Sequence, residues 1–460
     1  MTDTPWLAPL AGYIASFDGT RLDARTHDYV FSVMLDWAGA LFAGRGHPLF
    51  ERYQAALCGV PGETGPASVL GSAEGHPIGV AAATNAAVSH LWEVDDAHRV
   101  STSHPGITVI PALIALAEAF PQSPPERLRG AVVAGYEAIM RIGSFLGVDH
   151  YSVCHTTATA GCFGAAAAAA HFLALDEEHC LWALGHAGTQ AAGLWQFLDD
   201  GALEAKGFHA ATAARNGIAA ALAAKAGVPG AGRILEGPRG MLAAWHLQSA
   251  DRSVLVPQET PIIGDITIKN WPTCGQMHSA LDCAVDLLPD LGELPVDAIE
   301  KVVVEVPRSC TAIADRRTPA SVAEAKFSTA FCIAAILCGR PPDFSGLNDD
   351  LVADAAVHRL ASRIDVREDP AFSARFPKER PARVGIVRKE KGPLTRERSF
   401  RKGDPEAPWS REELIARARV ITALGGASDK VDGMVAWCDA FADARLATAD
   451  IRNLFRETVI

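Results

Sequence analysis

The sequence lacks the short motifs that identify the commonest enzyme chemistries. It contains no HExxH zinc motif, no GxSxG nucleophile motif, no P-loop and no GxGxxG segment after a strand. Its ten cysteines include no CxxC pair and stand singly, mostly in apolar segments. This scatter argues against an iron–sulfur cluster and is typical of small buried thiols in a cytosolic protein.

Long hydrophobic runs and a basic excess are also missing. No window reaches the ~18 uninterrupted apolar residues of a membrane span. The N-terminal segment MTDTPWLAPLAGYIASF has neither the basic region nor the clear cleavage site of a secretion signal. The net charge is −12, whereas nucleic-acid binders more often show a basic excess, so we expect a cytoplasmic protein with no membrane or nucleic-acid partner. A small anionic substrate is not excluded, because a pocket can be locally positive.

The composition that is present is that of a globular protein of two or three domains. The chain has 460 residues, of which 49% are apolar and 21% charged. Ala- and Leu-rich helical periodicity dominates roughly the first half of the chain. Residues 298–306 are then β-branched and predict a strand, and residues 383–387 with 396–400 predict a hairpin. Helices are expected at 274–288, 322–337 and 351–364, and again from residue 410.

These patterns predict a mainly α fold with an inserted domain. A large all-α helical domain is expected over residues 1–265 plus 405–460. A smaller α+β lid domain is expected over residues 266–404. Residues 161–173 are mostly Ala, with Gly161 and Gly164 near the start, and predict a buried central helix because small residues let helices pack closely.

The first candidate site segment is a polar loop that follows the helix expected at residues 81–91. It holds Asp95, Asp96, His98 and His104. Such side chains bind metals, but Asp and Ser in a loop also cap helices, and His transfers protons near neutral pH. Spacing alone leaves capping, catalysis and metal binding open.

Two further segments place His or Lys at a chain break. His155 precedes the Gly/Ala helix, whose free N–H groups suit a carboxylate, although Thr156 or Thr157 could simply be the cap. Lys206 and His209 stand at another helix entry. A lysine there can clamp an anion or donate a proton, although an exposed lysine is the usual outcome.

The last segment runs from Lys269 through a Trp-Pro turn to His278 and follows a strand-like stretch at 266–268. His278 is expected in the first turn of a helix at the start of the inserted domain. Clefts between domains commonly bind ligands, yet a His merely exposed on a first turn fits equally well. None of the four segments is specific by itself.

Taken in this order, the segments resemble the MmgE/PrpD family over most of the chain. The matching pieces are Asn85-Ala86-Ala87, Asp95-Asp96, His104-Pro105, Gly135-Tyr136-Glu137, Arg141-Ile142-Gly143, His155-Thr156-Thr157, Gly161, Phe163-Gly164-Ala165, Lys206 with His209, Ala213-Ala214-Arg215-Asn216-Gly217, Trp271-Pro272-Thr273-Cys274 with His278, and Glu324-Ala325-Lys326-Phe327-Ser328. The family includes 2-methylcitrate dehydratase, cis-aconitate decarboxylase and iminodisuccinate epimerase. The resemblance implies a helical domain with a smaller α+β lid, a homodimer, and an active site between the domains without metal or flavin.

The resemblance implies that His104, His155, Lys206, His278 and Asp95 form one catalytic site. A C–H beside a carboxylate is a very weak acid, so the site must supply a base and stabilise the developing negative charge. His104 and His155 are expected to move the proton. Lys206 and His278 are expected to hold carboxylates or to donate a proton. Asp95 is expected to orient a histidine.

Asp96, His209 and Lys269 are expected to bind the substrate, and no metal or other cofactor is expected. The expected function is a metal-independent lyase that dehydrates or decarboxylates a small di- or tricarboxylate. Ala97 stands where the decarboxylase pattern has a Thr, and Phe331 stands where a Tyr is common. Two alternatives therefore stay open: an epimerase of a small dicarboxylate such as an iminodisuccinate-like compound, and an inactive polyacid-binding family member.

Overall fold

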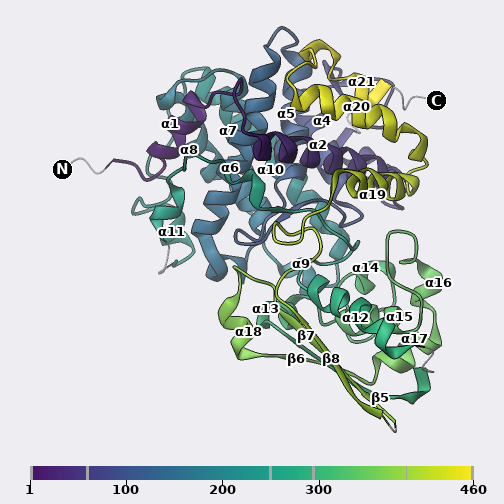
Figure 1. Cartoon of the computed structure of the whole chain (residues 1–460). Coiled ribbons are helices and arrows are strands. Elements are labelled where there is room, and N and C mark those ends of the chain that lie inside the picture. Colours follow the sequence, from purple (N-terminus) through teal and green to yellow (C-terminus); the bar gives the residue numbers. More distant parts are fainter. Residues whose placement is uncertain (1–3, 59–61, 248–250, 293–295, 390, 457–460) are drawn as a thin grey trace.

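A computed structural model describes residues 4–58, 62–247, 251–292, 296–389 and 391–456. Most of these residues are helical, and the strands form a small four-stranded sheet and two short ladders (Figure 1). The prediction of a mainly α fold is confirmed. The helices gather in one half of the molecule, and the four-stranded sheet lies with several helices in the other half.

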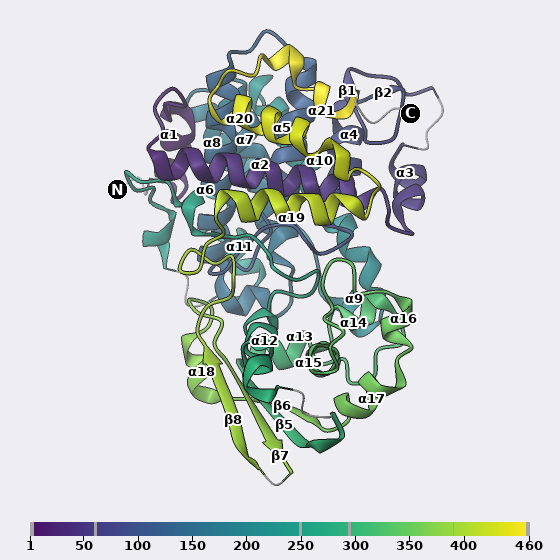
Figure 2. The same cartoon turned by 45° about the vertical axis from the view of Figure 1, so that its right-hand side comes forward.

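The first 267 residues contribute a helical array and two short ladders. The helices are α1 (Ala8–Ser16), α2 (Ala24–Gly44), α3 (Phe50–Cys58), α4 (Ile78–His90), α5 (Gly106–Ala119), α6 (Pro125–Tyr151), α7 (Thr156–Phe172), α8 (Glu177–Gln190), α9 (Gln196–Asp199), α10 (Lys206–Lys225) and α11 (Met241–Ala244). The ladders pair β1 (Ala67–Ser68) with β2 (Gly75–His76) and β3 (Ala97–His98) with β4 (Ile266–Thr267). The chain returns to this half with α19 (Arg411–Ala423), α20 (Val431–Ala442) and α21 (Asn453–Arg456), and α19 lies beside α2 (Figure 2).

Helix α7 forms the centre of the helical half, because small residues allow its neighbours to approach closely. All of its residues are buried, and α6, α10, α5 and α8 pack around it. A Cβ on Gly164 would lie 2.8 Å from the Cβ of Ile139, and one on Gly217 would lie 2.4 Å from the Cβ of Ala165. Larger side chains at these positions would separate α7 from α6 and α10.

Helix α6 is long and apolar enough to cross a membrane by length and composition alone. However, 83% of its most apolar window is buried inside the structure, as in the core helix of a soluble protein. A single helix of this kind is weak evidence for a membrane span.

The other half contains a mixed sheet with strand order β6-β5-β7-β8. Its elements are α12 (His278–Leu291), β5 (Ile299–Val306), α13 (Arg308–Ile313), α14 (Val322–Ala325), α15 (Thr329–Leu337), α16 (Asp349–Val352), α17 (Ala355–Ala361), β6 (Ile364–Glu368), α18 (Pro370–Arg375), β7 (Ala382–Arg388) and β8 (Lys391–Arg398). Strand β6 runs parallel to β5, with Val302 opposite Ile364, whereas β7 is antiparallel to both β5 and β8. Short 3₁₀ turns lie at Leu203–Ala205, Arg252–Leu255, Ile262–Asp265, Val296–Ala298, Ser428–Lys430 and Thr448–Asp450.

Three helices predicted in this half have different bounds in the structure. The helix expected at 351–364 ends at Ala361, and Ile364 begins β6, a strand that the sequence did not predict. The helix expected at 322–337 is broken, because the side chain of Ser328 accepts a hydrogen bond from the backbone N–H of Phe331 and starts a new helix. The helix expected from residue 274 begins at His278.

The buried side chains form two main hydrophobic clusters. One joins residues from Leu7 to Ile268 with residues from Leu414 to Phe455. The other consists of Leu203 and residues from Trp271 to Ile386. We propose that the chain divides into a helical domain of residues 1–265 plus 405–460 and a lid domain of residues 266–404, and the separation of the two clusters supports this division.

All ten cysteines lie in the described residues and are free thiols. Eight of them are buried. The expectation of small buried thiols is therefore confirmed at these positions.

Candidate active site

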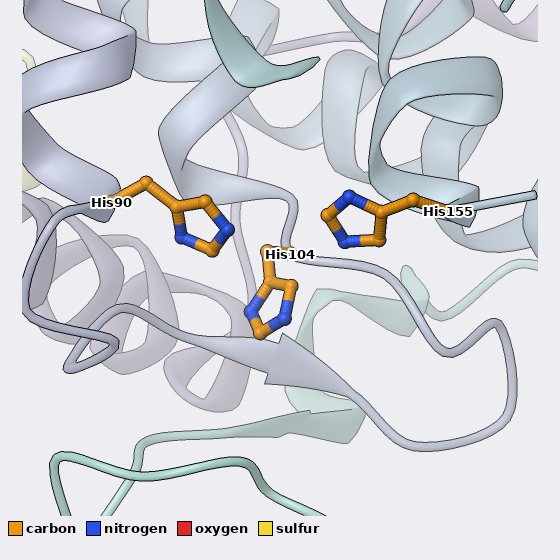
Figure 3. Close-up of side chains that lie close together, drawn as sticks. All are labelled: His90, His104 and His155. Carbon is orange, nitrogen blue, oxygen red and sulfur yellow. The ribbon is translucent and has the colours of Figure 1, made fainter. Parts of the chain in front are cut away.

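Three histidine rings from different parts of the chain gather around one space (Figure 3). His90 ends α4, His104 stands in the loop before α5, and His155 is the N-cap residue of α7. Ring centroids lie 5.0 Å apart for His90 and His104, 6.0 Å for His104 and His155, and 6.1 Å for His90 and His155. His104 and His155 were predicted, whereas His90 was missed because it appears in the sequence only as the last residue of an apolar helix.

Asp95 lies between two of these rings. Its Oδ1 is 2.9 Å from Nδ1 of His90, and its Oδ2 is 2.9 Å from Nδ1 of His104. Nδ1 of His104 also lies 2.7 Å from the backbone carbonyl oxygen of Asp96. These acceptors hold the His104 proton on Nδ1, so Nε2 keeps a free lone pair. The geometry therefore fits the predicted role of Asp95 as the group that orients a histidine.

Glu93 is a second buried carboxylate, and it pairs with two lysines. Nζ of Lys206 lies 2.6 Å from its Oε1 and 2.7 Å from its Oε2, and Nζ of Lys269 lies 3.3 Å from its Oε2. Although burial opposes ionisation, Lys206 and then Lys269 hold the pKa of Glu93 well below its usual range. The backbone of Glu93 has φ 59°, a left-handed conformation that a Glu rarely adopts. Glu93 was not predicted as a site residue, although the density of acids from residue 93 to 96 was a signal.

His104 and His155 are neutral at physiological pH. Burial, followed by the charge of Lys269, lowers the pKa of His104 to about 4, although Asp95 opposes this shift. Burial, Lys206 and the other histidines lower the pKa of His155 well below its usual value. Neutral imidazoles accept protons, so both rings have the protonation state of a general base.

His155 has a histidine partner of its own. Its Nδ1 lies 3.2 Å from Nδ1 of His209, so one ring donates and the other accepts. The ring of Trp195 lies 4.6 Å from the His155 ring, centroid to centroid, and the His155 backbone N–H donates to the carbonyl of Gly193. These contacts hold His155 at the start of α7, where no side chain caps the helix; neither Thr156 nor Thr157 is the N-cap.

A small cavity of about 40 Å³ lies against this cluster. Its walls come from both halves of the molecule. They are Glu93, Ala97, His98, Arg99, Thr102, Ser103, His104, Tyr151, His155, Trp195 and Lys206 from the helical half, and Cys274, Gly275, Gln276, Ile313, Phe327, Arg380 and Arg401 from the other part of the chain. A cavity of about 930 Å³ lies beside it and shares Tyr151, Trp195, Ile313 and Phe327 as wall residues.

Five predicted site residues do not line this cavity: Asp95 and His209, which contact its histidines, and Asp96, Lys269 and His278. Asp96 accepts hydrogen bonds from the Tyr136 hydroxyl and from the backbone N–H of Gly106, so it anchors the start of α5. Lys269 is fully buried and donates to Glu93. His278 is fully buried and its Nε2 lies 3.1 Å from the carbonyl oxygen of Thr273. We therefore infer positioning roles for Asp96 and Lys269, and the catalytic role of His278 stays a prediction.

The two departures from the family pattern lie in different places. Ala97 lines the cavity, on β3 opposite Thr267, so a hydroxyl at this position would face the site. Phe331 is fully buried in the second hydrophobic cluster, 5.1 Å from the His358 ring, and does not line the cavity. Ala97 alone of the two is placed to alter the chemistry.

Within the described part of the chain, the group of side chains that could approach one metal ion is His90, His104 and His155, rather than the acidic loop set considered from the sequence. Their ligand atoms lie within 4.8 Å of one another. Two ligands of a tetrahedral Zn²⁺ with bonds of about 2.05 Å lie only about 3.3 Å apart. Ligand atoms separated by the full 4.8 Å would have to move closer to share such an ion.

Buried neutral histidines make the stability of the protein dependent on pH. Burial lowers the pKa of His98 to about 3 and the pKa values of His104, His150 and His171 to about 4. In the unfolded chain each titrates near 6.5, so between pH 6.5 and 4 only the unfolded state binds these protons. Each histidine then removes up to about 1.4 kcal/mol of stability per pH unit as pH falls. Asp96 has the opposite effect: burial raises its pKa to about 8, so its carboxyl group takes up a proton in the folded state first and adds stability as pH falls.

We expect the urea midpoint of the protein to fall from pH 7 to pH 5. His150→Leu is expected to reduce this loss and to raise stability, because both ring nitrogens of buried His150 lack a hydrogen-bond partner. His246→Gln, at an exposed position, serves as the control and leaves the pH dependence unchanged. A urea midpoint that stays constant over this range contradicts the prediction.

The fold and the site together define a mainly α protein with a buried histidine, lysine and carboxylate cluster beside a cavity between two hydrophobic cores. Residues 8–252 match the MmgE/PrpD N-terminal domain, and residues 271–456 match the MmgE/PrpD C-terminal domain. The chain therefore belongs to the MmgE/PrpD family.

Several curated relatives are named cis-aconitate decarboxylase. The chain is 26% identical to the cis-aconitate decarboxylase of Homo sapiens over 78% of this chain and 76% of the relative. It is 25% identical to the cis-aconitate decarboxylase of Mus musculus over 89% of this chain and 85% of the relative. A cis-aconitate decarboxylase of Aspergillus terreus is 28% identical over 59% of this chain and 54% of the relative.

Proposed function

We propose that this protein is a lyase that transfers a proton at a carbon next to a carboxylate of a small di- or tricarboxylate. The observation that carries the proposal is the pair of neutral histidines, His104 and His155, on one cavity beside the Lys206–Glu93 ion pair. A neutral imidazole and a buried ammonium supply the two things that this chemistry needs: a proton acceptor, and positive charge where negative charge develops.

His104 is the better oriented of the two proton-transfer groups. Asp95 and the carbonyl of Asp96 hold its proton on Nδ1, which leaves Nε2 free to accept a proton and later to return it. Asp95 also stabilises the imidazolium that forms when Nε2 is protonated. His155 can pass a proton to or from His209 through their Nδ1 contact. Together these contacts provide two proton-transfer groups on the wall of one cavity.

Lys206 is the cavity residue that stabilises developing negative charge. Glu93 holds its ammonium in place, and Lys269 holds Glu93 through both the side chain and the backbone carbonyl. In a decarboxylation, the C–C bond to the carboxylate breaks, CO₂ leaves, and the electron pair stays on carbon until that carbon takes a proton. A fixed cation lowers the energy of this carbanion because no solvent reorganisation is needed.

The relatives favour decarboxylation of a cis-aconitate-like tricarboxylate as the first reaction to test, since several are named for it. Dehydration differs in that hydroxide leaves after the proton is removed. Epimerisation of an iminodisuccinate-like dicarboxylate differs in that only a proton is exchanged. The small cavity has about the volume of one water molecule, so we infer that the substrate extends into the larger cavity. The homodimer stays a proposal from the family resemblance.

The test is proton exchange with a panel of small polyacids in deuterated water, followed by NMR. We expect one of cis-aconitate, a 2-hydroxytricarboxylate or a 2-substituted succinate to gain deuterium at the carbon next to a carboxylate. Release of CO₂, loss of water, or exchange without other change distinguishes decarboxylation, dehydration and epimerisation. The proposal fails if no compound exchanges.

The same assay tests the metal-independent chemistry. Exchange is expected to persist after incubation with a chelator such as EDTA and dialysis, because protein groups orient both rings: Asp95 and the Asp96 carbonyl contact Nδ1 of His104, and His209 contacts Nδ1 of His155. Loss of exchange that added Zn²⁺ restores would reassign the three-histidine cluster to a metal site.

A further inference from the structure

Arg380 is a buried arginine on the wall of the small cavity. It precedes β7, and its residue is 5% exposed. Nη2 donates to the backbone carbonyl of Arg99 across the cavity wall at 3.0 Å. The guanidinium also lies over the ring of Phe376, 4.4 Å from its centroid. These contacts hold the side chain beside the cavity that His104 and His155 also line.

Two nitrogens of this guanidinium have no acceptor. Nε and Nη1 are buried and make no hydrogen bond to another group in the described residues. Within that same part of the chain, Arg380 forms no ion pair, although burial of a charge normally requires one. Asp404 is near enough to act on its charge, but Asp404 already pairs with Arg99 at 3.2 Å and with Arg401 at 2.7 Å.

The other cations on the cavity wall all have a carboxylate partner. Arg99 pairs with Glu406 at 2.7 Å as well as with Asp404. Lys206 pairs with Glu93 at 2.6 Å. Arg380 therefore differs from the other wall cations in lacking an acid, and an anion that enters the cavity can satisfy it.

We propose that Arg380 binds a carboxylate of the substrate and so selects for a polyacid over a monoacid. The inference rests on the proposed function and deepens it: a carboxylate next to the reacting carbon lies near Lys206, and a second carboxylate accepts hydrogen bonds from Arg380. Because Arg380 comes from the lid half and His104 from the helical half, a bound polyacid links the two halves.

The electrostatics of the site agree with an anion at this position. Burial, then the nearby charge of Arg401, lowers the pKa of Arg380 to about 9, although Tyr151 and Asp404 act in the opposite direction. Burial of the Arg380 charge is therefore unfavourable, and hydrogen bonds to a bound carboxylate would offset this loss of free energy. Arginine suits this contact because its planar group offers several fixed donors.

The test measures binding of tricarballylate, an unreactive saturated tricarboxylate, by calorimetry to the full chain. Arg380→Gln is expected to weaken binding about 10- to 100-fold, the loss typical of a charge-assisted hydrogen bond. Butyrate, which has one carboxylate, is expected to bind the two proteins with similar affinity. Arg380→Lys is expected to bind tricarballylate more weakly than the wild type and more tightly than Arg380→Gln, because lysine keeps the charge but not the planar donors. Arg367→Gln, at an exposed arginine, is the control.

A thermal melt separates this role from a structural one. Without ligand, Arg380→Gln is expected to melt at the same temperature as the wild type or higher, because the variant removes an unpaired buried charge. The rise in melting temperature caused by tricarballylate is expected to disappear. A lower melting temperature without ligand, equal tricarballylate affinity in both proteins, or no tricarballylate binding by the wild type overturns the inference. If the wild type binds tricarballylate through Arg380 but exchanges no proton with any polyacid, the proposed reaction fails and the Arg380 site stands.

Discussion

His104→Gln is expected to lower the rate of deuterium exchange into the substrate about 10²- to 10⁴-fold, the contribution of a positioned general base. Glutamine keeps a polar side chain of similar reach but cannot take a proton. Asp95 and the cavity would remain, so tricarballylate binding is expected to change little. The matched control is His186→Gln, which replaces a histidine outside the cluster whose Nε2 contacts the carbonyl of Val228.

The pH profile gives an independent check on this base. In the wild type, kcat/KM is expected to fall on the acid side near pH 4 rather than near 6.5, because burial and Lys269 lower the pKa of His104 to about 4. At higher pH the imidazole stays neutral and the rate stays high. If His104→Gln leaves the exchange unchanged and His155→Gln abolishes it, His155 is the base. Normal exchange in both variants would contradict the proposed mechanism.

Glu93→Ala is expected to destabilise the protein by about 3–5 kcal/mol, the loss typical when one partner of a buried ion pair is removed. Lys206 and Lys269 would remain buried near one another, with Asp95 as the nearest acid, 3.9 Å from Lys269. The measurement is urea unfolding at pH 7. The double variant Glu93→Gln with Lys206→Met is expected to be more stable than Glu93→Ala, because it removes both charges of the Lys206–Glu93 ion pair.

The control for this prediction is a surface ion pair of similar length. Asp432→Ala breaks the contact of Asp432 with Arg419, whose side chains are 81% and 46% exposed, and is expected to change stability by less than about 1 kcal/mol. Equal losses for Glu93→Ala and Asp432→Ala would mean that the Glu93 pair is solvated in solution. The predicted difference between the two variants follows only from their burial.

Local sequence patterns predicted much of the fold. The Ala-rich composition of residues 161–173 predicted α7, which begins earlier, at Thr156. The helix expected from residue 410 is α19, and Ser410 forms its capping box, which was not predicted. The β-branched run predicted β5, within one residue at its start. The predicted bounds were wrong where a helix and the strand after it share one run of apolar residues. Ile364 begins a strand because β5 lies beside it and supplies its backbone hydrogen-bond partners.

The candidate site was predicted less completely. His104, His155 and Lys206 are on the cavity, and Asp95 is beside it, as the resemblance implied. His90, Glu93 and Arg380 were missed. A histidine at a helix end and one arginine among many carry no local signal, and the run of acids from residue 93 to 96 does not single out Glu93. The roles of these side chains depend on their partners in the folded protein.

The sequence by itself determined that the protein is mainly α and belongs to a family of known architecture, since helix periodicity, caps and ordered motifs are properties of neighbouring residues. Tertiary structure alone decided which charges are paired and which histidines are neutral. Both depend on burial and on distances between side chains far apart in the chain. Glu93 pairs with Lys206 and Lys269, whereas Arg380 lines the same cavity without an ion-pair partner among the described residues. A charged side chain becomes a catalytic or binding group only when the fold shields it from water and places specific side chains beside it.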